Sequence, residues 1–98
     1  MTMLAVFRSR AQALDAVSRL GNAGVPAQAV STPKEAGYGC GLSVRFDARF
    51  YPRVAPVLKK RAYSAFAGYF RACGGTFVRV LVAFARRIWY NRGYEYDR

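Results

Sequence analysis

The alternation of strand and helix patterns constrains the fold of this chain more than any other feature. Residues 3–7 form an apolar run rich in Val and Phe, which is typical of a buried strand. Ser9 follows, with Gln12 three positions later, and this capping-box spacing predicts the first turn of a helix. Apolar residues then follow at the spacing of one helical face, namely Ala13, Ala16, Val17 and Leu20, and Gly21 and Gly24 provide a stop. We therefore expect a helix over residues 10–23.

Three more strands and a second helix are predicted in the following segments. Residues 26–30 can form an extended strand, and residues 42–46 alternate apolar and polar side chains with a period of two. A helix is expected over residues 50–61, where Pro56 would kink it if it lies in the interior. Residues 65–70 supply the fourth strand. The order βαββαβ predicts an α+β fold, a ferredoxin-like sandwich with two helices on one face of an antiparallel sheet.

The pattern changes after the glycine pair at residues 74–75. Apolar residues then repeat at the spacing of one helical face, namely Phe77, Leu81, Phe84 and Ile88. We therefore expect a helix over residues 76–90 and divide the chain into a ferredoxin-like domain, residues 1–71, and a helical extension with a polar tail, residues 72–98. The apolar face of this helix could pack on the sheet, on a second copy in a homo-oligomer, or on an anionic membrane surface.

Composition excludes most catalytic classes. The chain has 98 residues, about one domain, and contains no histidine. Without histidine the chain cannot build Ser-His-Asp, Cys-His or His-based zinc chemistry. Only 5 carboxylates are present, which leaves few candidates for a paired acid and base. Chemistry must therefore rest on cysteine or lysine, and we expect no metal and no cofactor.

The charge is strongly basic and unevenly distributed. The formal net charge is +11, of which residues 49–98 contribute +9. Such a charge predicts attraction to polyanions, which could be nucleic acid, an anionic membrane surface or an acidic partner. No uninterrupted apolar run is long enough to span a membrane, and the two cysteines lack CxxC spacing. We expect a cytoplasmic chain with reduced thiols.

Cys40 is the most reactive candidate in the sequence. It stands between Gly39 and Gly41 at the end of a glycine-rich segment, residues 31–41, which predicts a loop. Glycine neighbours give a thiol little steric cover, and unpaired N–H groups of such a turn can favour the thiolate. The structural alternative is a small cysteine packed at the base of a hairpin, with the glycines only turning the chain.

The surrounding motif resembles a known family. Thr32-Pro33-Lys34 is followed after five residues by Cys40-Gly41-Leu42, and Phe7-Arg8-Ser9 precedes the first helix. Over residues 3–70 this pattern resembles a bacterial family of selenium/sulfur carrier-protein-like domains, in which a Thr-Pro-Arg-like turn precedes a Cys-Gly-Leu that enters a strand. Lys34 stands where the family more often has arginine.

The resemblance implies that the chain is a carrier rather than a turnover enzyme. Cys40 would hold sulfur or selenium covalently, and the partners would be donor and acceptor proteins. The residues expected to shape, charge and open the pocket around it are Thr32, Pro33, Lys34, Gly39 and Gly41. Positive charge from Lys34, with Arg8 or Arg10, could stabilise a persulfide or selenide adduct. Arg45 is a weaker candidate. Cys73 could resolve an oxidised Cys40 by forming a disulfide, or could simply belong to a turn.

A second class of function remains open from the sequence. Lys59, Lys60 and Arg61 precede a run that interleaves aromatic residues with charge, comprising Tyr63, Phe66, Tyr69, Phe70 and Arg71. A sheet surface of this kind can stack nucleic-acid bases, in which case the cysteine would be incidental. The structural alternative is that these aromatic residues belong to the core.

Overall fold

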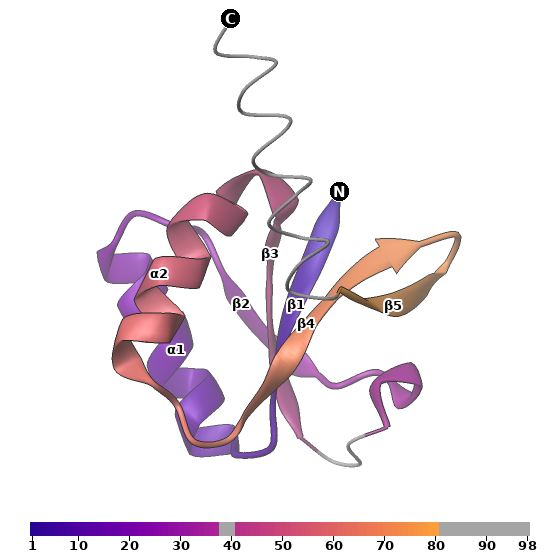
Figure 1. Ribbon diagram of the computed structural model, residues 1–98, viewed down its shortest axis with the longest axis horizontal. Helices are drawn as coiled ribbons and strands as arrows, with labels where there is room; N and C mark the ends of the chain where they lie inside the picture. The colour runs from indigo at the N-terminus through magenta and orange to yellow at the C-terminus, as the bar shows by residue number, and fades with distance from the viewer. Residues whose placement is uncertain (38–40, 81–98) are drawn as a thin grey trace, which may run out of the picture.

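The computed structural model describes residues 1–37 and 41–80, which fold as an α+β domain (Figure 1). Its elements are β1 (Thr2–Phe7), α1 (Arg10–Asn22), β2 (Gln28–Ser31), the 3-10 turn η1 (Lys34–Ala36), β3 (Leu42–Asp47), the 3-10 turn η2 (Ala48–Phe50), α2 (Tyr51–Arg61), β4 (Phe66–Cys73) and β5 (Thr76–Val80). The five strands of this described part form one antiparallel sheet in the order β2-β3-β1-β4-β5. Both helices lie on one face of the sheet (Figure 1).

The central strand β1 is buried on both faces. Met3, Ala5 and Phe7 belong to the larger core cluster, which lies between the sheet and the two helices. Leu4 and Val6 point to the opposite face and cluster there with other apolar side chains, including Ala36 of η1. A strand covered on both sides has no solvent face, which explains why residues 3–7 are apolar without alternation.

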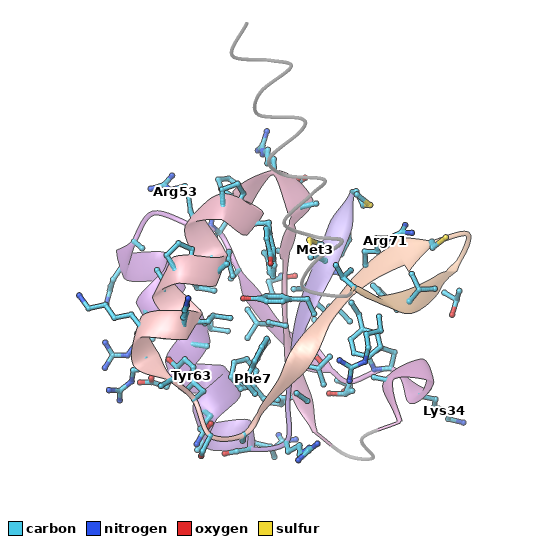
Figure 2. All side chains as sticks on the ribbon, viewed as in Figure 1. Met3, Phe7, Lys34, Arg53, Tyr63 and Arg71 are labelled. Carbon is cyan, nitrogen blue, oxygen red and sulfur yellow. The ribbon has the colours of Figure 1, made fainter. Side chains whose placement is uncertain are left out.

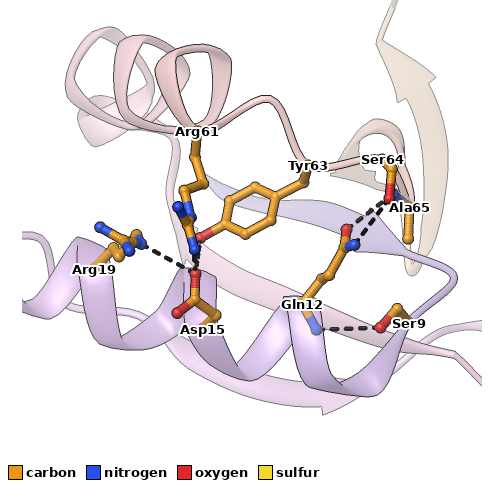
Figure 3. A network of polar contacts seen from close by, with 8 residues as sticks. All are labelled: Ser9, Gln12, Asp15, Arg19, Arg61, Tyr63, Ser64 and Ala65. Carbon is orange, nitrogen blue, oxygen red and sulfur yellow. Dashed lines mark hydrogen bonds and ion pairs between the residues drawn. The ribbon is translucent and has the colours of Figure 1, made fainter.

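The predicted cap of α1 is confirmed, but the capping box is only half formed. The backbone N–H of Gln12 donates to Ser9 Oγ at 3.2 Å. The side chain of Gln12 turns away from Ser9. It donates to Ser64 Oγ at 2.9 Å and accepts from the backbone N–H of Ala65 at 2.8 Å (Figure 3). Gln12 therefore ties the first turn of α1 to the connection between α2 and β4.

The second helix matches its prediction within one residue. It begins at Tyr51 after the 3-10 turn η2 and contains Pro56 in its interior. Val54 and Leu58 face the core, whereas Pro56 is exposed. Its C-terminal cap, Ala62, has a left-handed conformation with φ of 54°. Neither helix in the described ranges has the length and apolarity needed to cross a membrane.

The helix predicted to begin at Thr76 is wrong at its start. Thr76–Val80 forms strand β5, which pairs with β4 in a hairpin. Gly74 and Gly75 have φ values of 58° and 85°, and two successive positive φ values favour the two-residue turn that suits a twisted hairpin. Residues 81–90 of the expected helix and the polar tail lie outside the described residues. The division after residue 71 therefore stays a prediction.

Candidate functional site

The base of the loop that carries Cys40 is closed by a backbone hydrogen bond. Ser31, the last residue of β2, pairs with Leu42, the first residue of β3. Just beyond this pair, the N–H of Thr32 donates to the carbonyl oxygen of Gly41 at 3.1 Å. Cys40 directly precedes Gly41 in the chain. Cys40 and Gly39 lie outside the described residues, so the site is described from the residues that flank them.

Gly41 makes a close approach to the end of β1. A β-carbon built on Gly41 would lie 2.5 Å from the carbonyl oxygen of Phe7 and 3.4 Å from Thr32 Oγ1. Backbone at 2.5 Å leaves no room for any side chain. This contact gives Gly41 a packing role that the sequence argument, which used it to uncover the thiol, did not identify.

A pair of hydroxyl groups supports the same region. Thr32 Oγ1 and Ser43 Oγ are 2.9 Å apart and share a hydrogen bond. Ser43 is completely buried, on the face of the sheet that η1 covers, and its neighbours across the strands are Val6 and Val30. We call the Thr32–Gly41 hydrogen bond, the Thr32–Ser43 hydrogen bond and the Gly41–Phe7 contact the neck of the loop.

Between Thr32 and Gly37 the loop folds back under the sheet. Pro33 precedes η1, and Ala36 is buried against the side chains of Leu4, Val6 and Phe70. Gly37 ends the turn with φ of 74°. Lys34 is exposed, and Figure 2 shows its side chain directed away from the sheet. The buried alanine therefore anchors η1 while the lysine remains at the surface.

The other predicted cations occupy different positions relative to the neck. Arg8 follows Phe7 directly, and its backbone N–H donates to the carbonyl oxygen of Ala65 at 2.8 Å. Arg8 and Arg10 are both exposed at the end of β1 that contacts Gly41. Arg45 donates to Gln28 Oε1, and along the strand it lies about 7 Å from Ser43 and about 13 Å from Gly41. Arg45 is therefore more distant from the neck than Arg8.

Cys73 lies at the opposite end of the sheet. It is exposed, with a free thiol, at the β4–β5 hairpin. Phe7 pairs with Phe66, and Cys73 is seven residues farther along β4, roughly 20 Å from the neck. The Cα atoms of a disulfide are at most about 7 Å apart, and Cys40 is bonded to Gly41 with a Cα separation of about 3.8 Å. The sheet therefore keeps Cys73 from resolving Cys40 within one chain.

The aromatic residues that could have stacked bases belong mostly to the core. Tyr69 and Phe70 are 8% and 4% exposed. Tyr63 and Phe66 pack edge-on against Phe7, with ring centroids 5.3 and 5.5 Å away. Figure 2 places Phe7 between the helices and the sheet. The structural interpretation of these aromatics is confirmed, so the described chain offers no aromatic platform from them for nucleic acid.

A polar cluster joins the two helices beside this core (Figure 3). Asp15 Oδ2 accepts from the Tyr63 hydroxyl at 2.6 Å, from Arg19 Nε at 3.0 Å and from Arg61 Nε at 3.4 Å. The Tyr63 hydrogen bond, followed by that of Arg19, holds the pKa of Asp15 below its ordinary value. Burial and the Asp15 carboxylate raise the pKa of Tyr63. The cluster keeps both partners in the charge states that favour their hydrogen bond.

One of three comparisons with known proteins gives a match. A model of the family described as "Putative Se/S carrier protein-like" matches residues 2–66, from β1 to the first residue of β4. The matched range includes Cys40 and every residue of the neck. No curated protein and no solved structure matches the chain.

Proposed function

The chain belongs to the Se/S carrier protein-like family, and we propose that Cys40 is the thiol that carries the sulfur or selenium atom. The observation that carries this proposal is the neck. The residue after Cys40 is packed against the Phe7 carbonyl and hydrogen-bonded to Thr32, so the chain next to the thiol is fixed to the sheet. Fixing the backbone beside a reacting group lowers the entropy lost when that group meets its partner.

Loading would be a thiol–persulfide exchange. The Cys40 thiolate attacks the outer sulfur of a persulfide on the donor protein. A new S–S bond forms at Cys40, the S–S bond of the donor breaks, and its electron pair leaves on the donor thiolate. One S–S bond replaces another, so no external oxidant or reductant is consumed. Selenium would follow the same course with an S–Se bond, and unloading to an acceptor thiolate repeats the exchange.

Charge near the neck supports an anionic adduct. Three exposed cations lie on segments that flank the loop or the end of β1: Lys34 in η1, and Arg8 and Arg10 just after β1. Nearby cations stabilise a thiolate and, by the same Coulombic effect, a persulfide anion. The substrate-binding residues of the proposal are Thr32, Pro33, Lys34, Gly39 and Gly41, and Arg8 or Arg10 adds positive charge.

The proposal also includes the topology of the domain and its location in the cell. The order β2-β3-β1-β4, with α1 and α2 on one face, supports a ferredoxin-like sandwich to which β5 is added. We place the carrier in the cytoplasm, where thiols remain reduced and can exchange with donor and acceptor proteins.

The test is mass spectrometry of the full chain after incubation with a persulfide donor. We expect one added sulfur on the peptide that contains Cys40, no adduct at that position in Cys40→Ser, and undiminished loading in Cys73→Ser. Equal labelling of the two cysteines, or no adduct at Cys40, would refute the carrier role.

A further inference from the structure

Basic residues from two distant parts of the sequence lie at the same end of the sheet as the neck. Arg8 and Arg10 follow the end of β1, and Lys59 and Lys60 lie in the last turn of α2. The pairing of Phe7 with Phe66 brings the end of β1 beside the start of β4, just after α2 ends. Figure 1 shows the end of α2, the start of α1 and the start of β3 together at this end. We call these four residues the basic end.

Among the described side chains, neither Asp15 nor Asp47 offsets the charge of Arg10, Lys59 and Lys60. All four residues of the basic end are exposed. Asp15 already accepts hydrogen bonds from Tyr63, Arg19 and Arg61. Asp47 pairs with Thr2 at the opposite end of β1 and caps η2. The basic end therefore presents a positive field to solvent.

Helix electrostatics explains only half of this charge. Lys59 and Lys60 stand in the last turn of α2, where the helix dipole favours cations. Arg10 is the first residue of α1, where the dipole disfavours a cation, and the first turn of α1 has no acidic residue. The dipole of α1 therefore gives no reason for the charge of Arg10, which is exposed three residues after Phe7 and available to a partner.

We propose that the basic end docks an acidic surface of the protein that exchanges sulfur or selenium with this chain, an inference that rests on the proposed function. An acidic protein fits better than nucleic acid because Tyr69 and Phe70 of β4, which could have stacked bases, are buried. Complementary charge speeds encounter and orients the partner, and here it would bring the partner to the end of the sheet that holds the neck.

The first experiment measures binding of a fluorescein-labelled oligoglutamate peptide to the full chain by fluorescence anisotropy at low salt. Lys60→Glu and Arg10→Glu test the basic end. Arg49→Glu is the matched control, because Arg49 is exposed in η2 at the opposite end and its reversal changes net charge equally. We expect about threefold weaker binding for each test variant and less than about twofold for the control. Equal losses in all three variants would overturn the proposal.

A second experiment distinguishes nucleic acid from an acidic protein as the partner, and it tests loading of Cys40 separately from docking. Duplex DNA that binds more tightly than the peptide, and is weakened by the same variants, would overturn the acidic-protein proposal in favour of nucleic acid. A neutral small-molecule persulfide tests loading of Cys40 without docking. Loading without localised peptide binding refutes the docking surface alone. Localised binding without loading leaves a surface that binds acidic peptides but refutes the carrier role, and with it the exchange partner.

Discussion

The backbone carbonyl oxygen of Phe7 occupies the space in which a side chain on Gly41 would begin, 2.5 Å from the position of its β-carbon. This relationship joins the end of β1 to the start of β3 immediately after Cys40. The close packing explains why the residue after the candidate thiol is a glycine. Gly41 lets the start of β3 pack against the end of β1, in addition to its predicted role of leaving the neighbouring thiol uncovered.

Gly41→Ala should therefore destabilise the fold, by about 1–3 kcal/mol, because the added methyl group collides with backbone that cannot rotate away. Urea unfolding measures the change in the free energy of unfolding. Gly21→Ala is the control, since a β-carbon on Gly21 in α1 meets nothing within 4 Å and should stabilise the helix by roughly 0.5–1 kcal/mol. Equal unfolding of Gly41→Ala and the wild type would contradict the close approach.

The losses of stability from removing the two hydroxyls of the neck should not be additive, because each hydroxyl is the hydrogen-bond partner of the other. Thr32→Val leaves the buried Ser43 Oγ without its partner, at a cost of about 1–3 kcal/mol. Ser43→Ala added to that variant removes the unpaired group and should recover part of the stability. A double-mutant cycle by chemical denaturation tests this, and strictly additive losses would show that the two hydroxyls do not interact.

Tyr63→Phe should raise the pKa of Asp15 towards its ordinary value, because the Tyr63 hydroxyl is the largest cause of its lowering. A lowered folded-state pKa stabilises the fold above the unfolded pKa of about 4, and this stabilisation is lost as pH falls through the folded pKa. Carboxyl chemical shifts followed by NMR measure the change. Asp47 is an internal control, since its own lowering comes first from the Arg49 backbone N–H. A parallel shift of both carboxyls would contradict the assignment.

Mild oxidation should not join Cys40 to Cys73 within one chain. The sheet separates Cys73 from the neck by roughly 20 Å, far beyond the reach of a disulfide. Non-reducing electrophoresis with peptide mapping should reveal either free thiols or links between chains. A monomeric species with an internal Cys40–Cys73 bond would mean that the sheet opens at one end.

Local patterns predicted most elements because their signals are short-range. The capping serine, the period-two alternation and the apolar run of β1 each lie within a few residues. The start of the expected C-terminal helix was wrong because Phe77 fits both a helical stripe and a strand, and a five-residue strand has too few positions to decide between them. The glycine pair before it was the hairpin signal that decides for the strand.

The roles of the candidate site residues stay predictions. Sequence motifs singled out Thr32, Lys34 and Gly41, but they could not reveal the burial of Ser43, which looked like an ordinary polar position in an alternating strand. Its face of the sheet carries the smaller core cluster, to which η1 contributes Ala36. The basic end could not be predicted either, since the pairing of β1 with β4 is what places Arg10 and Lys60 at the same end of the sheet.

The most direct test of the carrier role follows a heavy-isotope sulfur atom from a persulfidated donor through the full chain by mass spectrometry. The account predicts that the label appears on the peptide containing Cys40 and leaves that peptide when an acceptor thiol is added. An unlabelled Cys40 peptide, or the same label on the acceptor when Cys40→Ser replaces the wild type, would contradict it.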